Sequence, residues 1–147
     1  MRAVRAIPSG PIEFTLSAPY KLLNPLLRMH WASRRNYAAA VSSEIAIRAA
    51  EHEGRPPMSR ARVTIERHSV QEPDEDGLIG GAKLVIDALL VRSKTHPLGN
   101  GFLLDDRPAC MELIVRHVKA KRAEQRTTVL IEPLIEPGTF PVTVVIS

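Results

Sequence analysis

The stretch Pro73–Leu90, PDEDGLIGGAKLVIDALL, decides how the rest of the chain is interpreted. It opens with three acids, Asp74, Glu75 and Asp76, and then becomes apolar with helical spacing. The apolar positions are Leu78, Ile79, Ala82, Val85, Ile86, Leu89 and Leu90. Because residues three and four apart share one side of a helix, this pattern predicts a helix with one side in a core.

The polar side of this predicted helix carries a lysine between acids. Lys83 and Asp87 are four residues apart, and Asp76 lies seven residues before Lys83, two turns back on the same stripe. A further pair, Asp105-Asp106, follows after a loop. One element can therefore present a carboxylate, an ammonium group and a second carboxylate along one side.

These residues also have ordinary structural explanations. Asp74 or Asp76 can cap the helix, because free N–H groups and the helix dipole favour carboxylates near the N-terminus. Lys83 and Asp87 can form an exposed ion pair worth roughly a few tenths of a kcal/mol. The sequence leaves both explanations open.

Length and composition indicate a globular protein with a basic surface. The 147 residues, 44% hydrophobic and 24% charged, predict one domain over residues 1–147 with a substantial core. The chain has no apolar run long enough to predict a membrane span, and its basic start lacks the apolar segment of a secretory signal. A lone Cys110 excludes a disulfide framework and fits a reducing cytoplasm. The net charge of +4 suits an anionic partner.

Alternation and helical spacing predict an α+β fold, with helices packed on a mixed sheet in the order β-α-β-α-β-β. The expected strands are Ile12–Ser17, Arg62–Ser69, Met111–Lys119, Thr127–Glu132 and Phe140–Ile146. The expected helices are Ser33–Glu51, with Ser33 as a cap, and Pro73–Leu90, and the expected loops are Ala18–Pro25 and Val91–Gly101. The core spans about residues 12–132, between an N-terminal arm and the last strand.

Charge is distributed unevenly along this layout. Acids concentrate in Glu72–Asp76, at Asp87 and in Asp105-Asp106, whereas bases concentrate in Arg28–Arg48 and Arg116–Arg126. Metal-dependent cleavage of nucleic acid needs this combination, since Lys and Arg hold phosphates while carboxylates hold the cation. Carboxylate oxygens suit Mg²⁺, which is often bound by only a few protein ligands and by substrate phosphate.

Three other features are less decisive. Trp31 and Tyr37 lie among basic residues in the sequence and can stack on unpaired nucleotides, although packing against the core is the favoured interpretation. Gly80-Gly81 early in a helix predicts the close approach of another backbone or helix. The five histidines show no pair at zinc-ligand spacing, and Cys110 has no neighbouring base that would make it a nucleophile.

The acidic constellation resembles the RusA family of Holliday-junction resolvases. The matching residues are Asp74-x-Asp76, Lys83, Asp87-Ala88-Leu89 and Asp105-Asp106. The resemblance also covers the leading strand, the loop with Asn24, the basic first helix and the paired strands after Asp106, or roughly residues 12–132. It implies a RusA-like fold, hydrolysis of a DNA phosphodiester by metal-activated water, and Mg²⁺ as the cofactor, with Mn²⁺ as an alternative.

The resemblance also implies roles for individual residues. The implied catalytic residues are Asp74, Asp76, Lys83 and Asp106, and the implied metal ligands are Asp74, Asp76, Asp105 and Asp106. Lys83 would neutralise charge building on the phosphate or leaving oxygen, and Asp87 would either orient Lys83 or pack structurally. The basic residues expected to bind DNA are Arg28, Arg34, Arg35, Lys119, Lys121 and Arg122.

Two departures from the family pattern stand out. Gly77 replaces the family's asparagine after the second aspartate and supplies no side-chain hydrogen bond. The loop Val91–Gly101 is longer than expected for the family, and a longer loop would alter how a substrate approaches.

Three functions therefore remain open. The first is a Mg²⁺-dependent endonuclease acting on four-way or other branched DNA in recombination and repair, expected to be a homodimer because a junction needs two opposed nicks. The second is a branched-DNA-binding protein with weak or no cleavage. The third is an interaction protein whose acids are a solvated face.

Overall fold

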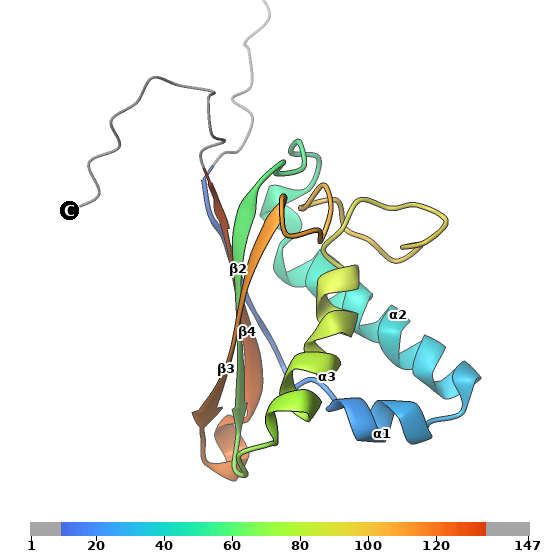
Figure 1. The fold of residues 1–147 in the computed structure, drawn as a ribbon, viewed down its shortest axis with the longest axis vertical. Coiled ribbons are helices and arrows are strands. Elements are labelled where there is room, and N and C mark those ends of the chain that lie inside the picture. Colours follow the sequence, from blue (N-terminus) through green and yellow to red (C-terminus); the bar gives the residue numbers. More distant parts are fainter. Residues whose placement is uncertain (1–9, 135–147) are drawn as a thin grey trace, which may run out of the picture.

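Four strands form one mixed sheet in the spatial order β1-β4-β2-β3 (Figure 1). They are β1 (Ile12–Leu16), β2 (Ala61–Ser69), β3 (Met111–Lys119) and β4 (Arg126–Pro133). β4 is antiparallel to both β1 and β2, whereas β2 and β3 are parallel. The structure, a computed structural model, describes residues 10–134. The predicted strand Phe140–Ile146 and nearly all of the N-terminal arm lie outside that range.

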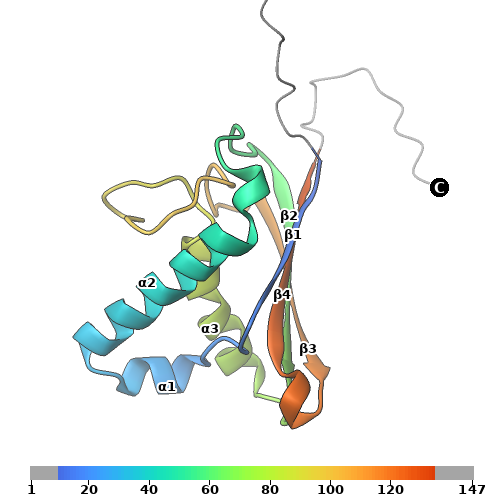
Figure 2. The same ribbon diagram turned by 180° about the vertical axis from the view of Figure 1, so that it is seen from behind.

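The three α-helices lie on one face of this sheet (Figures 1 and 2). They are α1 (Leu23–Arg28), α2 (Trp31–Arg48) and α3 (Glu75–Asp87). Two short 3-10 turns complete the described elements, η1 (Ala50–His52) after α2 and η2 (Arg122–Glu124) between β3 and β4. α3 joins the parallel strands β2 and β3, because a parallel pair needs a crossover connection.

Alternating side chains build the core between the sheet and the helices. Val63 and Ile65 of β2 and Val129 and Ile131 of β4 are fully buried, and each pair is two residues apart. α3 contributes the buried Ala82, Val85 and Ile86 from the side of the helix that packs on the sheet. Most of the predicted apolar stripe therefore faces the sheet, but Ile79 is 46% exposed, and Lys83 lies on the solvent side.

The mixed sheet confirms the predicted α+β class, with corrections to the helices. α3 ends at Asp87 and not at Leu90, and α2 ends at Arg48 and not at Glu51. The expected loop Ala18–Pro25 runs into α1, where Pro25 is tolerated because it lies in the first helical turn. α2 begins at Trp31 and not at Ser33, because the His30 ring accepts a hydrogen bond from the backbone N–H of Ala32. No helix among residues 10–134 is long and apolar enough to cross a membrane.

The N-terminal half of α3 packs closely on the segment that precedes and starts α1. A Cβ added at Gly81 would collide with the backbone carbonyl oxygen of Lys21, and one at Gly80 would collide with the Leu23 side chain. The Tyr20 hydroxyl donates a 2.7 Å hydrogen bond to the Leu78 carbonyl oxygen. The close approach predicted from the two glycines is therefore confirmed, and the partner is residues 21–23.

Candidate active site

Lys83 is the centre of the most complete charged cluster near α3. Its ammonium group lies 3.7 Å from Asp106 Oδ2 and 3.9 Å from Asp87 Oδ1. The lysine side chain is 67% exposed, whereas Asp106 is 30% exposed. The structure thus brings together three of the predicted site residues, one of them from beyond the loop that follows α3.

Asp87 is the half-buried member of this cluster. Its Oδ1 atom is shielded from solvent and accepts no hydrogen bond from the described residues. Burial raises the pKa of the Asp87 carboxyl, the charges of Lys83 and His96 oppose that rise, and Asp106 adds to it. The carboxylate is therefore held in place by charge and not by hydrogen bonds, which suits the predicted role of orienting Lys83.

His96 is a fourth member that the sequence did not reveal. Its Nδ1 atom lies 3.7 Å from Asp87 Oδ1. The loop that carries it is anchored at its C-terminal end, where the Asn100 side chain donates to the Ala88 carbonyl oxygen and Ser42 donates to that of Leu98. The sequence held one indication of this contact. His96 lies between Asp87 and the Asp105-Asp106 pair, in the loop that must fold back towards α3 if those acids are to meet.

Both carboxylate oxygens of Asp105 already contact neighbouring residues. Its Oδ1 accepts the Asp106 backbone N–H at 2.7 Å, and its Oδ2 lies 2.7 Å from Arg107 Nε. The backbone hydrogen bond from Asp106, with help from Arg107, lowers the pKa of the Asp105 carboxyl. Asp105 thereby fixes the turn that presents Asp106 to Lys83.

Asp74 and Asp76 lie at the other end of α3 and are exposed. Asp74 occupies the N-cap position, but its side chain makes no capping hydrogen bond. Its Oδ1 atom lies over Gly77, where an added Cβ would come within 2.6 Å of it. Glycine in place of the expected asparagine therefore leaves room for the Asp74 carboxylate above the first turn.

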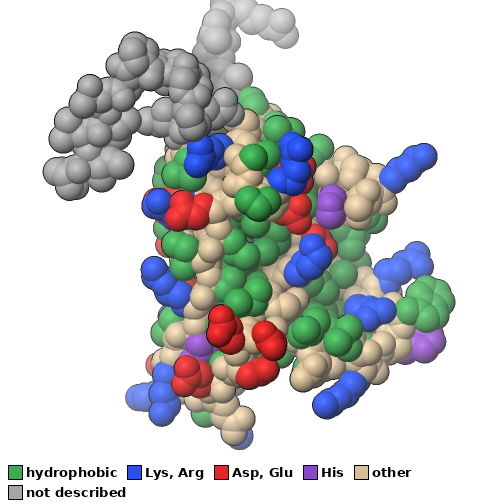
Figure 3. All heavy atoms as spheres, in the orientation of Figure 1, with side chains coloured by type: hydrophobic (Ala, Val, Ile, Leu, Met, Phe, Trp, Pro, Cys, Tyr) green, Lys and Arg blue, Asp and Glu red, His purple; other side chains and the backbone are tan. Residues whose placement is uncertain are grey.

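The predicted metal ligands are not gathered into one close group within the described residues. Asp76 and Asp87 are eleven residues apart on one helix, which corresponds to about 16 Å along its axis. In Figure 3 acidic side chains accordingly appear in separate places on this face. Within the described part of the chain, no three or more Asp, Glu, His or Cys side chains are grouped closely enough to hold a metal ion.

The basic residues predicted to bind DNA flank the start of α3. Three belong to the end of α1 and the first turns of α2, and three lie at the end of β3 and the start of η2, where Lys121 is the N-cap residue. Figures 1 and 2 show these two corners on opposite sides of the N-terminus of α3. None of the six forms an ion pair with an acid among residues 10–134, so their charges remain available to phosphates.

Trp31 projects from the first of these basic corners. It is 60% exposed, with the His30 ring 5.5 Å and the Arg35 guanidinium 5.7 Å from its ring. Packing against the core was the wrong interpretation for Trp31, because α2 begins there and turns its first side chain outward. It was right for Tyr37, which packs against the core and accepts a 2.9 Å hydrogen bond from the Lys21 backbone N–H.

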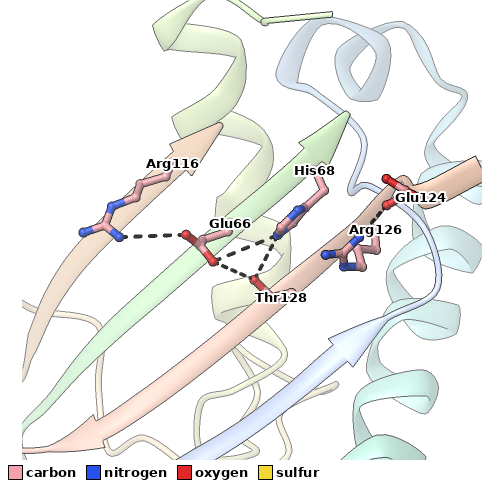
Figure 4. A network of polar contacts seen from close by, with 6 residues as sticks. All are labelled: Glu66, His68, Arg116, Glu124, Arg126 and Thr128. Atoms are coloured by element: carbon pink, nitrogen blue, oxygen red, sulfur yellow. Dashed lines mark hydrogen bonds and ion pairs between the residues drawn. The ribbon is translucent and has the colours of Figure 1, made fainter. Parts of the chain in front are cut away.

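A second polar network lies on the opposite face of the sheet, away from α3 (Figure 4). Glu66 on β2 accepts a 3.2 Å hydrogen bond from the Thr128 hydroxyl and lies 3.8 Å from the guanidinium of Arg116. Its carboxylate also lies 4.0 Å from His68, whose pKa is lowered by burial and by the charge of Arg126. These contacts join β2, β3 and β4 across their outer face and are separate from the Lys83 cluster.

Comparison with known proteins adds no identification. Searches of family models, of curated proteins and of solved structures found no match to this chain.

Proposed function

We propose that this protein is a divalent-cation-dependent endodeoxyribonuclease of the RusA type, acting on four-way and other branched DNA. One observation carries the proposal: Lys83 lies between Asp87 and Asp106, on an acidic face flanked by basic side chains that have no acidic partner among residues 10–134. A cation at a reacting phosphate needs carboxylates to position it. A DNA strand is a polyanion, and to bind it the protein needs Lys and Arg side chains around that point that are not already neutralised by acids.

Lys83 supplies positive charge to the phosphate in this proposal. Its ammonium group is exposed, and Asp87 and Asp106 restrict where it points. Charge held in advance at the place where the transition state becomes more negative lowers the barrier without reorganisation. Lys83 is therefore expected to act on the rate more than on affinity.

The acidic residues fit a hard cation by their chemistry. Mg²⁺ keeps several waters and is commonly bound by one or two carboxylates together with substrate phosphates, so either Asp74 with Asp76 or Asp106 can provide its protein ligands. When bound, Mg²⁺ or Mn²⁺ would supply a nucleophile by lowering the pKa of a bound water. Asp105 serves instead as the support of Asp106, through its bond to Arg107.

Binding is proposed to rest on phosphate contacts from the two basic corners. Because each contact releases counterions, affinity for DNA should fall steeply with salt, whatever the sequence. We place this activity in the cytoplasm, in line with the single, reduced Cys110.

The protein is proposed to act as a homodimer, because resolving a junction takes two matching nicks and a two-fold dimer supplies two matching sites. Of the two predicted dimer surfaces, the apolar side of α2 packs into the core through Val41 and Ile45, and the segment Phe140–Ile146 lies outside the described residues. Sedimentation equilibrium at micromolar concentration should give twice 16.2 kDa. A purely monomeric protein that still resolves junctions would contradict this.

The deciding experiment is cleavage of a synthetic four-way junction with and without Mg²⁺, with a linear duplex of the same sequence as control. We expect paired nicks on opposed strands of the junction with Mg²⁺, none with EDTA, and none in the linear duplex. A gel shift with EDTA at rising salt tests binding alone.

The second candidate, a branched-DNA-binding protein with weak or no cleavage, has one specific observation in its favour. The acids at the two ends of α3 do not form a single metal-binding group among residues 10–134. Salt-dependent junction binding without any cleavage by Mg²⁺ or Mn²⁺ would establish this function. Salt-independent or absent binding would instead indicate an interaction protein with a solvated acidic face.

A further inference from the structure

A hollow of about 300 Å³ opens beside Lys83, between α1, α2, α3 and the loop after α3. Its walls are mainly apolar and include Leu27, Ala38 and Leu84. Figure 3 shows the surface hollowed between this loop and the α1–α2 corner, with hydrophobic side chains inside and Lys or Arg side chains at its edges. We call this hollow the α1–α3 groove.

The polar side chains of the groove are few. Arg34 and Lys83 contribute positive charge to its lining, Asp87 contributes a carboxylate, and Thr95 and His96 complete the set. Asp87 Oδ1 is shielded, and the Asp87 side chain as a whole is 40% exposed. The groove therefore combines apolar walls, a carboxylate and two cations.

The size and the exposed leucine limit what the groove can hold. A volume of about 300 Å³ is at the lower end of pockets for small molecules, which suits one planar ring system and not a helix. Leu27 is 61% exposed, so an apolar surface is uncovered at the edge of the groove. Apolar side chains of this kind pack on the faces of an unpaired base, while a polar group reads its edge.

We propose that the α1–α3 groove binds an unpaired nucleobase of the DNA strand whose phosphate lies at Lys83. The apolar walls contact the faces of the base, Asp87 accepts from its N–H edge, and Arg34 and Lys83 lie against the adjoining phosphates. Charge complementarity favours a nucleotide over an apolar peptide, because the two cations on the lining attract phosphates, which an apolar peptide lacks. This inference rests on the proposed action on branched DNA and gives it a structural basis, since bases at a branch point unstack at low cost.

The test uses the full chain in EDTA, with four-way junctions that carry 2-aminopurine either at the branch point or within an arm. The fluorescence of this base rises when it leaves the stack, and fluorescence anisotropy of an end label reports binding separately. Wild-type protein should raise the branch-point signal severalfold and leave the arm signal unchanged.

Ala38→Leu fills the groove without changing charge. We expect it to remove most of the branch-point signal and to reduce the preference for junction over linear duplex by about tenfold. Binding of the linear duplex should be unchanged, since it depends on phosphate contacts. Ala46→Leu is the matched control, because Ala46 is exposed on the same helix and outside the groove. Circular dichroism checks that both variants are folded.

Each outcome decides the matter. Junction binding by the wild type without a branch-point signal overturns the groove proposal and leaves the proposed function standing, whereas no junction binding at all overturns both. A branch-point signal that survives in Ala38→Leu also overturns the groove proposal. If that variant instead loses self-association, the groove belongs to a protein segment and not to a base.

Discussion

The two ends of α3 carry similar acids in different surroundings. At the N-terminal end Asp74 and Asp76 are exposed, and neither forms an ion pair with a described residue. At the C-terminal end Asp87 and Asp106 are partly buried and lie within 4 Å of Lys83. Aspartate is thus free to bind a ligand at the N-terminal end, whereas at the C-terminal end it is already engaged with the ammonium group of Lys83.

The difference shows how one rigid helix can carry a group of acids fixed by contacts at its C-terminal end and a group open to a ligand at its N-terminal end. The C-terminal group is fixed by contacts between segments far apart in the sequence, since Asp106 and His96 arrive from beyond the helix. The N-terminal group is held by the packing of Gly81 on the segment before α1, and its carboxylates point into solvent. In our proposal the first group positions charge at the phosphate, and the second contributes ligands to the bound cation.

Replacing one acid at each end gives the largest expected effect. Asp76→Asn should reduce junction cleavage by about 1,000-fold, because it removes a proposed metal ligand, and Asp106→Asn should reduce it by about 100-fold, because it releases Lys83 from its position at the phosphate. Junction binding in EDTA should remain near that of the wild type, since the basic corners are untouched. If one variant cuts at the wild-type rate, that end of α3 has no part in catalysis and the comparison must be redrawn.

Lys83→Ala should reduce the single-turnover cleavage rate by about 100-fold and change affinity by no more than about threefold. One lysine is a small part of the phosphate contacts, but a charge aimed at the reacting phosphate acts mainly in the transition state. Lys94→Ala, in the exposed loop after α3, is the matched control and should change neither quantity. An equal loss of rate and affinity would make Lys83 a binding contact only.

The packing of the N-terminal end can be tested by stability alone. Gly81→Ala should lower the free energy of unfolding by about 1–3 kcal/mol, because the new methyl group would overlap the Lys21 carbonyl oxygen. Helix propensity alone predicts the opposite sign, a gain of about 1 kcal/mol. Gly80→Ala meets only the Leu23 side chain and should cost less. Urea denaturation of both variants measures the difference, and a stabilised Gly81→Ala would show that the contact is loose.

The smallest effect concerns the pKa of Asp87, which NMR titration of its carboxyl carbon should place above the ordinary value of 3.8. Burial is the main cause of the rise, and neighbouring charges modify it. Asp106→Asn should lower this pKa because it removes a nearby negative charge, and His96→Gln should raise it because it removes a nearby positive charge. A raised folded-state pKa stabilises the protein below pH 3.8, and that contribution is lost as pH rises through the folded pKa. The effect on stability should be less than about 1 kcal/mol, because the side chain is 40% exposed. A midpoint at or below 3.8 would contradict the burial of this end.

Much of the fold could be predicted because its signals are local. The alternation in residues 12–16 and 61–69 and the helical spacing after Asp76 depend only on near neighbours, and the structure has strands and a helix there. α1 was missed because six residues make a weak helix by themselves and this one is stabilised by packing on α3. The exposed Trp31 was missed because its orientation depends on where α2 begins.

The sequence by itself determined which residues carry charge, that Lys83 shares a helix face with Asp87, and that two glycines would allow close packing. Only the tertiary structure decided that Asp106 and His96 reach that face, that Asp105 is taken by Arg107, and that Asp74 and Asp76 stay apart from them. The physical reason is the helix itself. A rigid helix fixes the separation of its two ends at about 1.5 Å per residue, so acids that look adjacent in a motif meet only if a distant loop brings them together.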